Sequence, residues 1–144
     1  MHERNDNPLL LDLTFKSAIL DSLPANIAVI GPSGEVLAVN LSWQKFADAN
    51  GMAEHALLGV GANYLSVCRS AITDPDARAA LQGIRHVMSG SLPSFYHEYS
   101  CHSPTEKRWF ALRAAPLLDF PNYVVVSHED ISERILAEQQ RKHS

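Results

Sequence analysis

The spacing of apolar residues along the chain changes at Gly90, from the spacing of a helix to the alternation of a strand. Before this glycine, residues 75–89 space their apolar side chains as one face of a helix does. After it, apolar and polar residues alternate over 94–102, 107–117 and 123–128, and turn-forming residues at 103–105 and 119–122 separate the three runs. The pattern therefore predicts a helix followed by three successive strands.

A pair of short β-branched runs near the start completes the set of strands. Residues 26–30 and 36–39 flank the Gly-Pro-Ser-Gly turn at 31–34 and predict a hairpin. Helices are predicted at 9–23, between Asn40 and Asn50, after Asp74 and over 131–142, whereas 52–73 gives only weak helical turns. If the first hairpin pairs beside the last three strands, this order forms one five-stranded antiparallel sheet with helices on one face, an α+β fold.

Size and charge restrict the class of protein. A chain of 144 residues with 46% hydrophobic content predicts one compact domain. A net charge of -4 without a long basic run argues against nucleic acid and anionic membranes as partners. The chain has no long apolar run and starts with polar residues, so we expect a cytoplasmic location and two free thiols, Cys68 and Cys101.

Four segments, in the same order, resemble the PAS family: 23–47, 80–90, 106–117 and 129–138. The last, EDISERILAE, is similar to the Asp-Ile-Thr motif that ends many PAS domains, with Ser132 in place of Thr. The resemblance covers about residues 20–138 and implies a PAS-like five-stranded antiparallel sheet. It also implies that Asp130 and Arg134 fasten the core to an output helix, and we expect these two residues to form a salt bridge.

The resemblance implies a sensory or regulatory module of a signal-transduction protein, such as a histidine kinase, a cyclic-di-GMP enzyme or a chemoreceptor. The expected division is an N-terminal amphipathic helix at 1–23, a PAS core at 24–130 and the start of a signalling helix at 131–144. Because that helix stops where a coiled-coil linker would begin, we expect a fragment of a longer protein with a C-terminal effector domain.

The resemblance also bears on cofactors. Light-sensing relatives carry a reactive Cys in a Gly-x-Asn-Cys-Arg motif, but the matching segment here has Tyr64 in place of the Cys. Haem-binding relatives use a His early in the long helix, where this chain has Ala79. Neither flavin photochemistry nor haem is therefore expected, and His86 and His97 are the only axial candidates worth testing.

Residues 97–102 (His-Glu-Tyr-Ser-Cys-His) suggest a metal site or a nucleophile, but strand geometry argues against both. His97 and Cys101 share a face of the strand yet stand too far apart to share an ion, and Cys101 and His102 point to opposite faces. Cys68 is interpreted as a small buried hydrophobic residue. No metal site, no catalytic residue and no enzyme activity are expected.

The inward-facing residues predict a small-molecule pocket between the sheet and the helices. If the resemblance fixes the faces, Phe95, Ala114 and Val124 face inward beside seven candidate ligand-binding residues. These seven are Tyr64, His97, Tyr99, Phe110, Leu112, Val126 and His128. An alternative interpretation is that both histidines are core residues, hydrogen-bonded to each other or to the backbone.

A second function of a different class is homodimerisation without any ligand. The N-terminal helix carries large apolar residues that must be covered, and Trp109 faces outward on the fourth strand. In PAS proteins such a helix commonly packs against a second copy. The residues expected at the dimer contact are Leu9, Leu13, Phe15, Ile19 and Trp109, with the helix also covering the outer face of the sheet.

Overall fold

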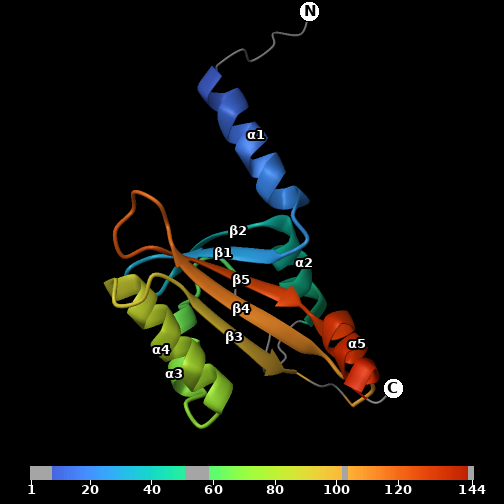
Figure 1. Cartoon of the computed structure of the whole chain (residues 1–144). Coiled ribbons are helices and arrows are strands. Elements are labelled where there is room, and N and C mark those ends of the chain that lie inside the picture. Colours follow the sequence, from blue (N-terminus) through green and yellow to red (C-terminus); the bar gives the residue numbers. More distant parts are fainter. Residues whose placement is uncertain (1–7, 51–58, 102–103, 143–144) are drawn as a thin grey trace, which may run out of the picture.

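The structure, a computed structural model, describes residues 8–50, 59–101 and 104–142. Within these ranges the chain forms five helices and five strands (Figure 1). They are α1 (Pro8–Ser22), β1 (Asn26–Ile30), β2 (Val36–Val39), α2 (Leu41–Asn50), α3 (Tyr64–Ser70), α4 (Pro75–Ser89), β3 (Phe95–Ser100), β4 (Trp109–Pro116), β5 (Val124–Asp130) and α5 (Ser132–Lys142).

The strands form one antiparallel sheet in the order β2-β1-β5-β4-β3. The first hairpin pairs beside the last three strands, since β1 lies against β5 with Ala28 opposite Val126. Neighbouring pairs bring Leu112 opposite His128 and Tyr99 opposite Phe110. The α+β fold expected from the sequence, a five-stranded antiparallel sheet with an N-terminal and a C-terminal helix, is therefore confirmed.

Alternation along the strands separates an inner, buried face from an outer face. Helix α2 packs on β1, and α4 packs on β3 and β4 with α3 beside it (Figure 1). A Cβ atom at Gly83 of α4 would come within 2.4 Å of the Phe95 ring, so the glycine lets α4 approach β3 closely. The largest fully buried side chains between these layers are Trp43, Ile30, Ile84, Leu112, Val36, Val124 and Val126.

The boundaries of α4 follow its capping residues. The Asp74 carboxylate accepts a hydrogen bond from the Asp76 backbone N–H at 2.9 Å, and Gly90 ends the helix in a left-handed conformation (φ 85°). The predicted helix is confirmed. In the weak segment 52–73, α3 forms behind an Asn63 cap, and residues 52–58 lie outside the described residues.

Asn40 does more than cap α2. Its Oδ1 accepts from the Trp43 N–H at 3.0 Å, as a cap does, and also from the Ile27 N–H at 2.9 Å. Its Nδ2 donates to the carbonyl oxygens of Leu20 and Ala25 at 2.9 Å. One buried side chain thus joins the end of α1, the start of β1 and the start of α2.

Helix α1 projects away from the sheet and has no buried residue (Figure 1). Its C-terminal end is held by α2, where the Leu41 N–H donates to Asp21 and the Ser42 hydroxyl donates to the Leu23 carbonyl. The expectation that this helix covers the outer face of the sheet is therefore wrong. Helix α5, not α1, packs on β4.

The C-terminal strands differ from the predicted ones at their ends. β3 ends at Ser100, and β5 continues to Asp130 because Glu129 and Asp130 still pair with Ala111 and Phe110 of β4. Helix α5 then starts at Ser132. No helix in the described ranges is long and apolar enough to span a bilayer.

Candidate functional site

His128 lies at the centre of a hydrogen-bonded cluster on the inner face of the sheet. Its side chain projects from β5, and the residue is only 6% exposed. The Tyr64 hydroxyl of α3 lies 2.9 Å from its Nε2, and the Tyr99 hydroxyl of β3 lies 2.9 Å from its Nδ1. The Trp43 ring of α2 meets the imidazole edge-on, with ring centroids 5.6 Å apart. Side chains from three elements, α2, α3 and β3, therefore converge on one imidazole of β5.

Burial keeps the members of this cluster uncharged. Loss of solvation lowers the pKa of His128 to about 4, so the ring is neutral at physiological pH. Burial is also the main cause that raises the pKa of Tyr64 and of Tyr99 above that of a free phenol. The cluster is thus a neutral chain of hydrogen bonds in an apolar core.

Six of the seven candidate ligand residues lie around this cluster. Phe110, Leu112 and Val126 are buried on the same face, and the Tyr99 ring stacks on the Phe110 ring with centroids 5.9 Å apart. Tyr64, Tyr99 and His128 are the hydrogen-bonded members. The inward orientation expected for the residues of β3, β4 and β5 agrees with their burial.

His97 takes a separate partner. Its Nε2 lies 2.7 Å from Asp76 Oδ1 at the start of α4, and its ring stacks between those of Phe95 and Tyr99. The alternative interpretation expected the two histidines to bond to each other or to the backbone, but their partners are the side chain of Asp76 for His97 and two tyrosine hydroxyls for His128. The sequence analysis did not identify Asp76, because in the sequence it is only an acidic residue in the first turn of a predicted helix.

The remaining residues considered for cofactor or metal chemistry are scattered. Cys68 is buried in the core as expected, and burial raises its thiol pKa to about 11. His86 is exposed on α4, Cys101 lies just beyond β3, and His102 lies outside the described residues. Among the residues that the structure describes, no three His, Cys, Asp or Glu side chains gather as a metal site.

The link between β5 and α5 is tightly bonded. Asp130 Oδ1 accepts from the Ser132 N–H at 2.9 Å, so Asp130 caps the helix. The Ser132 hydroxyl accepts from the Trp109 N–H, and the Ile131 N–H donates to the Trp109 carbonyl, both at 2.9 Å. The first residues of α5 are thereby fixed to the first residue of β4.

Arg134 does not pair with Asp130, so the salt bridge expected from the sequence is wrong. Its guanidinium pairs with Glu98 on the outer face of β3, and with Glu138 one turn along the helix at 3.7 Å. Glu98 also accepts from the Tyr96 hydroxyl, and the Arg113 guanidinium lies over the Tyr96 ring, 4.4 Å from its centroid. Hydrogen bonds from Tyr96 and then Arg134 lower the pKa of Glu98.

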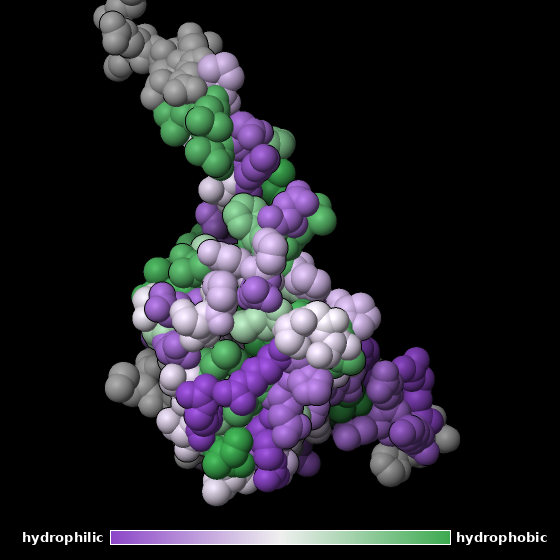
Figure 2. All heavy atoms as spheres, turned by 90° about the vertical axis from the view of Figure 1, so that its left-hand side faces the viewer, coloured by the Kyte–Doolittle hydropathy of each residue, from purple (hydrophilic) through white to green (hydrophobic). Residues whose placement is uncertain are grey.

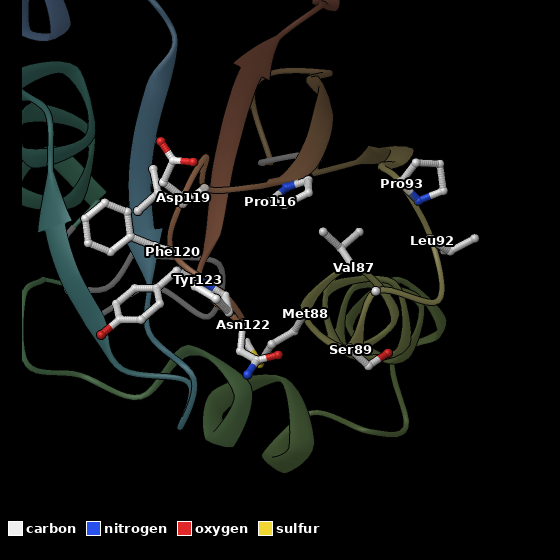
Figure 3. A pocket seen from close by; sticks show the side chains of 13 residues that line it. Val87, Met88, Ser89, Leu92, Pro93, Pro116, Asp119, Phe120, Asn122 and Tyr123 are labelled. Carbon is white, nitrogen blue, oxygen red and sulfur yellow. The ribbon is translucent and has the colours of Figure 1, made fainter.

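A groove of about 490 Å³ lies outside the core, between the end of α4 and the β4–β5 loop. Figure 3 shows Val87 and Met88 of α4 on one side of it and Phe120 and Tyr123 of the loop on the other. The loop bends through Asp119 and Asn122, both with φ 67°. None of the seven candidate ligand residues lines this groove.

Together, the sheet order and the helices over its inner face define a PAS-type α+β domain. The model of the family described as the PAS fold matches residues 20–136. The chain belongs to the PAS fold family.

One curated relative is an uncharacterized 104.1 kDa protein in the hypE 3' region of Rhodobacter capsulatus. It is 38% identical over 124 residues, which is 84% of this chain but only 13% of that protein. The chain thus spans a small part of a much longer relative.

Solved structures share the fold at low identity. The PAS domain of Bordetella pertussis BvgS is 21% identical, with a TM-score of 0.56 over 91% of this chain and 93% of that one. An RNA-binding Light-Oxygen-Voltage receptor is 15% identical, with a TM-score of 0.59 over 99% of this chain and 40% of that one. A PAS domain from a two-component sensor histidine kinase is 10% identical, with a TM-score of 0.50 over 85% and 98%.

Proposed function

We propose that this PAS domain is the sensory module of a longer signal-transduction protein, such as a histidine kinase or a cyclic-di-GMP enzyme. A small molecule binds at the inner face beside the Tyr64–His128–Tyr99 cluster, and the signal leaves through α5. The observation that carries this proposal is the position of His128: its ring is bonded on both nitrogens, and only four residues further along the chain α5 begins at Ser132.

The short link between β5 and α5 supports a mechanical relay. The Trp109 backbone is bonded to both Ile131 and Ser132, and Ile131 is buried. Because little slack remains between the strand and the helix, a displacement of His128 along β5 is passed on to the first turn of α5. The Glu98–Arg134 pair extends the connection to the far edge strand, β3. Coupling between such sites is typically worth about 1–3 kcal/mol.

Related proteins support the same role at the level of signalling. One of the solved structures is described as a PAS domain of a two-component sensor histidine kinase. The 13% share of the Rhodobacter protein leaves ample length there for other domains. A sensory domain coupled to a C-terminal effector fits both observations.

Amide hydrogen exchange tests the relay without any ligand. Tyr99→Phe keeps the ring but removes one of the two hydrogen bonds to His128, so exchange should become several-fold faster at the end of β5 and in α5. Tyr123→Phe, the same change in the β4–β5 loop, is the matched control and should leave α5 unaffected. If the two variants give the same exchange in α5, the cluster does not communicate with the helix.

Homodimerisation through α1 is the second candidate function, since its large apolar side chains are exposed on all sides. Figure 2 shows hydrophobic surface along this helix. The exposed residues are Leu9, Leu10, Leu11, Leu13, Phe15, Ile19 and Leu20, at 42–66%. These side chains are spread around the helix and do not gather on one face, so α1 is not the amphipathic helix that the sequence analysis expects. A second copy of α1 offers a matching apolar surface.

Trp109 is not part of this proposed contact. It is half buried at the start of β4, and its backbone is bonded to the start of α5. Figure 1 shows α1 and α5 well apart. The contact proposed for the dimer therefore consists of Leu9, Leu13, Phe15 and Ile19 without Trp109.

A further inference from the structure

The three side chains of the Tyr64–His128–Tyr99 cluster carry three N–H or O–H protons, but only two hydrogen bonds join them. A neutral imidazole has one N–H donor and one nitrogen that only accepts, and each tyrosine hydroxyl carries one proton. One tyrosine must therefore donate to His128, while the other accepts from it. The accepting tyrosine keeps an O–H proton that neither of the two hydrogen bonds uses.

The imidazole is neutral on geometric grounds as well as by its low pKa. Its ring contacts in the described residues are the two hydroxyls and the Trp43 ring, none of which carries a charge. No carboxylate among these contacts would stabilise a cation in this buried position. The proton count above therefore holds.

Burial decides which tyrosine keeps the unused proton. Tyr64 is 8% exposed and packs against Trp43, and within the described part of the chain its hydroxyl bonds only to His128. An unused donor there would be buried without an acceptor, which is unfavourable. Tyr99 lies on the edge strand β3 and is only half buried. Tyr64 thus donates to Nε2, and the Nδ1–H donates to the oxygen of Tyr99.

We propose that the Tyr99 hydroxyl is the ligand-binding donor of this domain and that it binds a flat, uncharged molecule through a carbonyl-type acceptor oxygen. This inference rests on the proposed sensory function. The two hydrogen bonds to His128 leave this proton unused, so an acceptor atom of a ligand can bond it without replacing either of them. Binding strengthens the chain of hydrogen bonds that ends at Tyr64, which makes His128 respond to an occupied site.

The surroundings of Tyr99 set the rest of the ligand's chemistry. Its ring is nearly parallel to those of His97 (14°) and Phe110 (24°), so a flat ligand can continue this row of rings. The Asp76 carboxylate, bonded to His97, disfavours an anion, and the apolar Leu112 and Phe110 side chains disfavour any buried charge.

Nitrogen-15 NMR of the imidazole tests the proton assignment without a ligand. His128 should be the Nδ1–H tautomer, with Nε2 unprotonated. Observation of the Nε2–H tautomer would move the unused proton to Tyr64 and overturn the proposal. This measurement does not depend on the exchange experiment on α5, so failure here and failure of the sensory function are distinguishable.

A matched pair of probes tests the ligand chemistry. Acetophenone, which has a carbonyl oxygen, should bind about tenfold tighter than ethylbenzene, which has a similar shape and no oxygen, as expected for one net hydrogen bond. Acetophenone should also shift the His128 Nδ1 signal. Tyr99→Phe should abolish the preference, whereas Tyr96→Phe, on the outer face of the same strand, should keep it. Equal affinities, or no binding of either probe, would overturn the proposal.

Discussion

His128 is the residue on which burial has its clearest energetic consequence. A histidine in water has a pKa near 6.5, and burial lowers that of His128 to about 4. Between these values the unfolded chain binds a proton that the folded protein does not. Stability therefore rises with pH across this window and is fully present above about pH 6.5.

Acid should consequently destabilise the domain through this residue. As the pH falls from about 6.5 to about 4, the His128 contribution should lower the free energy of unfolding by on the order of 3 kcal/mol. Urea unfolding at pH 7 and pH 4.5 measures the loss, and His128→Phe should reduce it. The exposed His86→Phe serves as the control and should retain the wild-type pH dependence. An equal pH dependence in both variants would contradict the assignment.

At the scale of elements, α5 is held at its start, where Ser132 also bonds to Trp109 of β4, and at Arg134. Asp130 caps its first turn, and Arg134 joins it to Glu98 of β3. The second contact crosses the outer face of the sheet to a strand far from α5 in sequence. The relay proposed for this domain therefore includes Glu98, which the motif at the end of the chain does not contain.

Removing either partner of the Glu98–Arg134 pair should loosen α5 in the same way. Glu98→Gln and Arg134→Gln should each speed amide exchange in α5, and the double variant should add little to either, because both remove one contact. Glu138→Gln, which alters the other partner of Arg134, should have a smaller effect. Additive effects of the two single changes would show that the pair is not a unit.

In the longer signalling protein proposed above, the same substitutions should uncouple effector output from the stimulus while the domain stays folded. Asp130→Ala belongs to this set because Asp130 caps the helix. Dose–response curves of effector activity for these variants and wild type measure the effect, and curves that coincide would remove Asp130 and Arg134 from the signalling route.

At the scale of the whole molecule, α1 is the element on which the proposed homodimer depends. Each large apolar side chain on it is worth roughly 1.5–3 kcal/mol when buried, so leaving the entire helix in water is costly. We therefore expect a homodimer in solution. The core of the domain has its own contacts and does not need α1 for burial.

Charges on α1 should therefore separate the subunits without unfolding them. Phe15→Glu with Ile19→Glu, one turn apart, should convert the dimer to monomer in sedimentation velocity. Leu118→Glu is the control, since Leu118 is 82% exposed in the β4–β5 loop. A dimer that persists with both α1 charges would place the contact elsewhere.

The sequence by itself determined most of the elements and the alternation along the strands. Capping residues such as Asp74 and Gly90 marked the ends of α4, and the period of two divided the residues of β4 and β5 between two faces, of which the resemblance to PAS domains implied the inner one. These features depend on neighbouring residues only, so they can be inferred without knowing what lies across the core. The apolar character of α1 was equally visible, because it needs no partner to be recognised.

Only the tertiary structure decided which polar side chains meet. Tyr64 and His128 are 64 residues apart, Glu98 and Arg134 are 36 apart, and Asn40 reaches across to Leu20 and Ala25. The local motif suggested Asp130 as the partner of Arg134, but the fold brought Glu98 of β3 to it instead. Such pairings depend on distances across the packed sheet and helices, which period and composition do not encode.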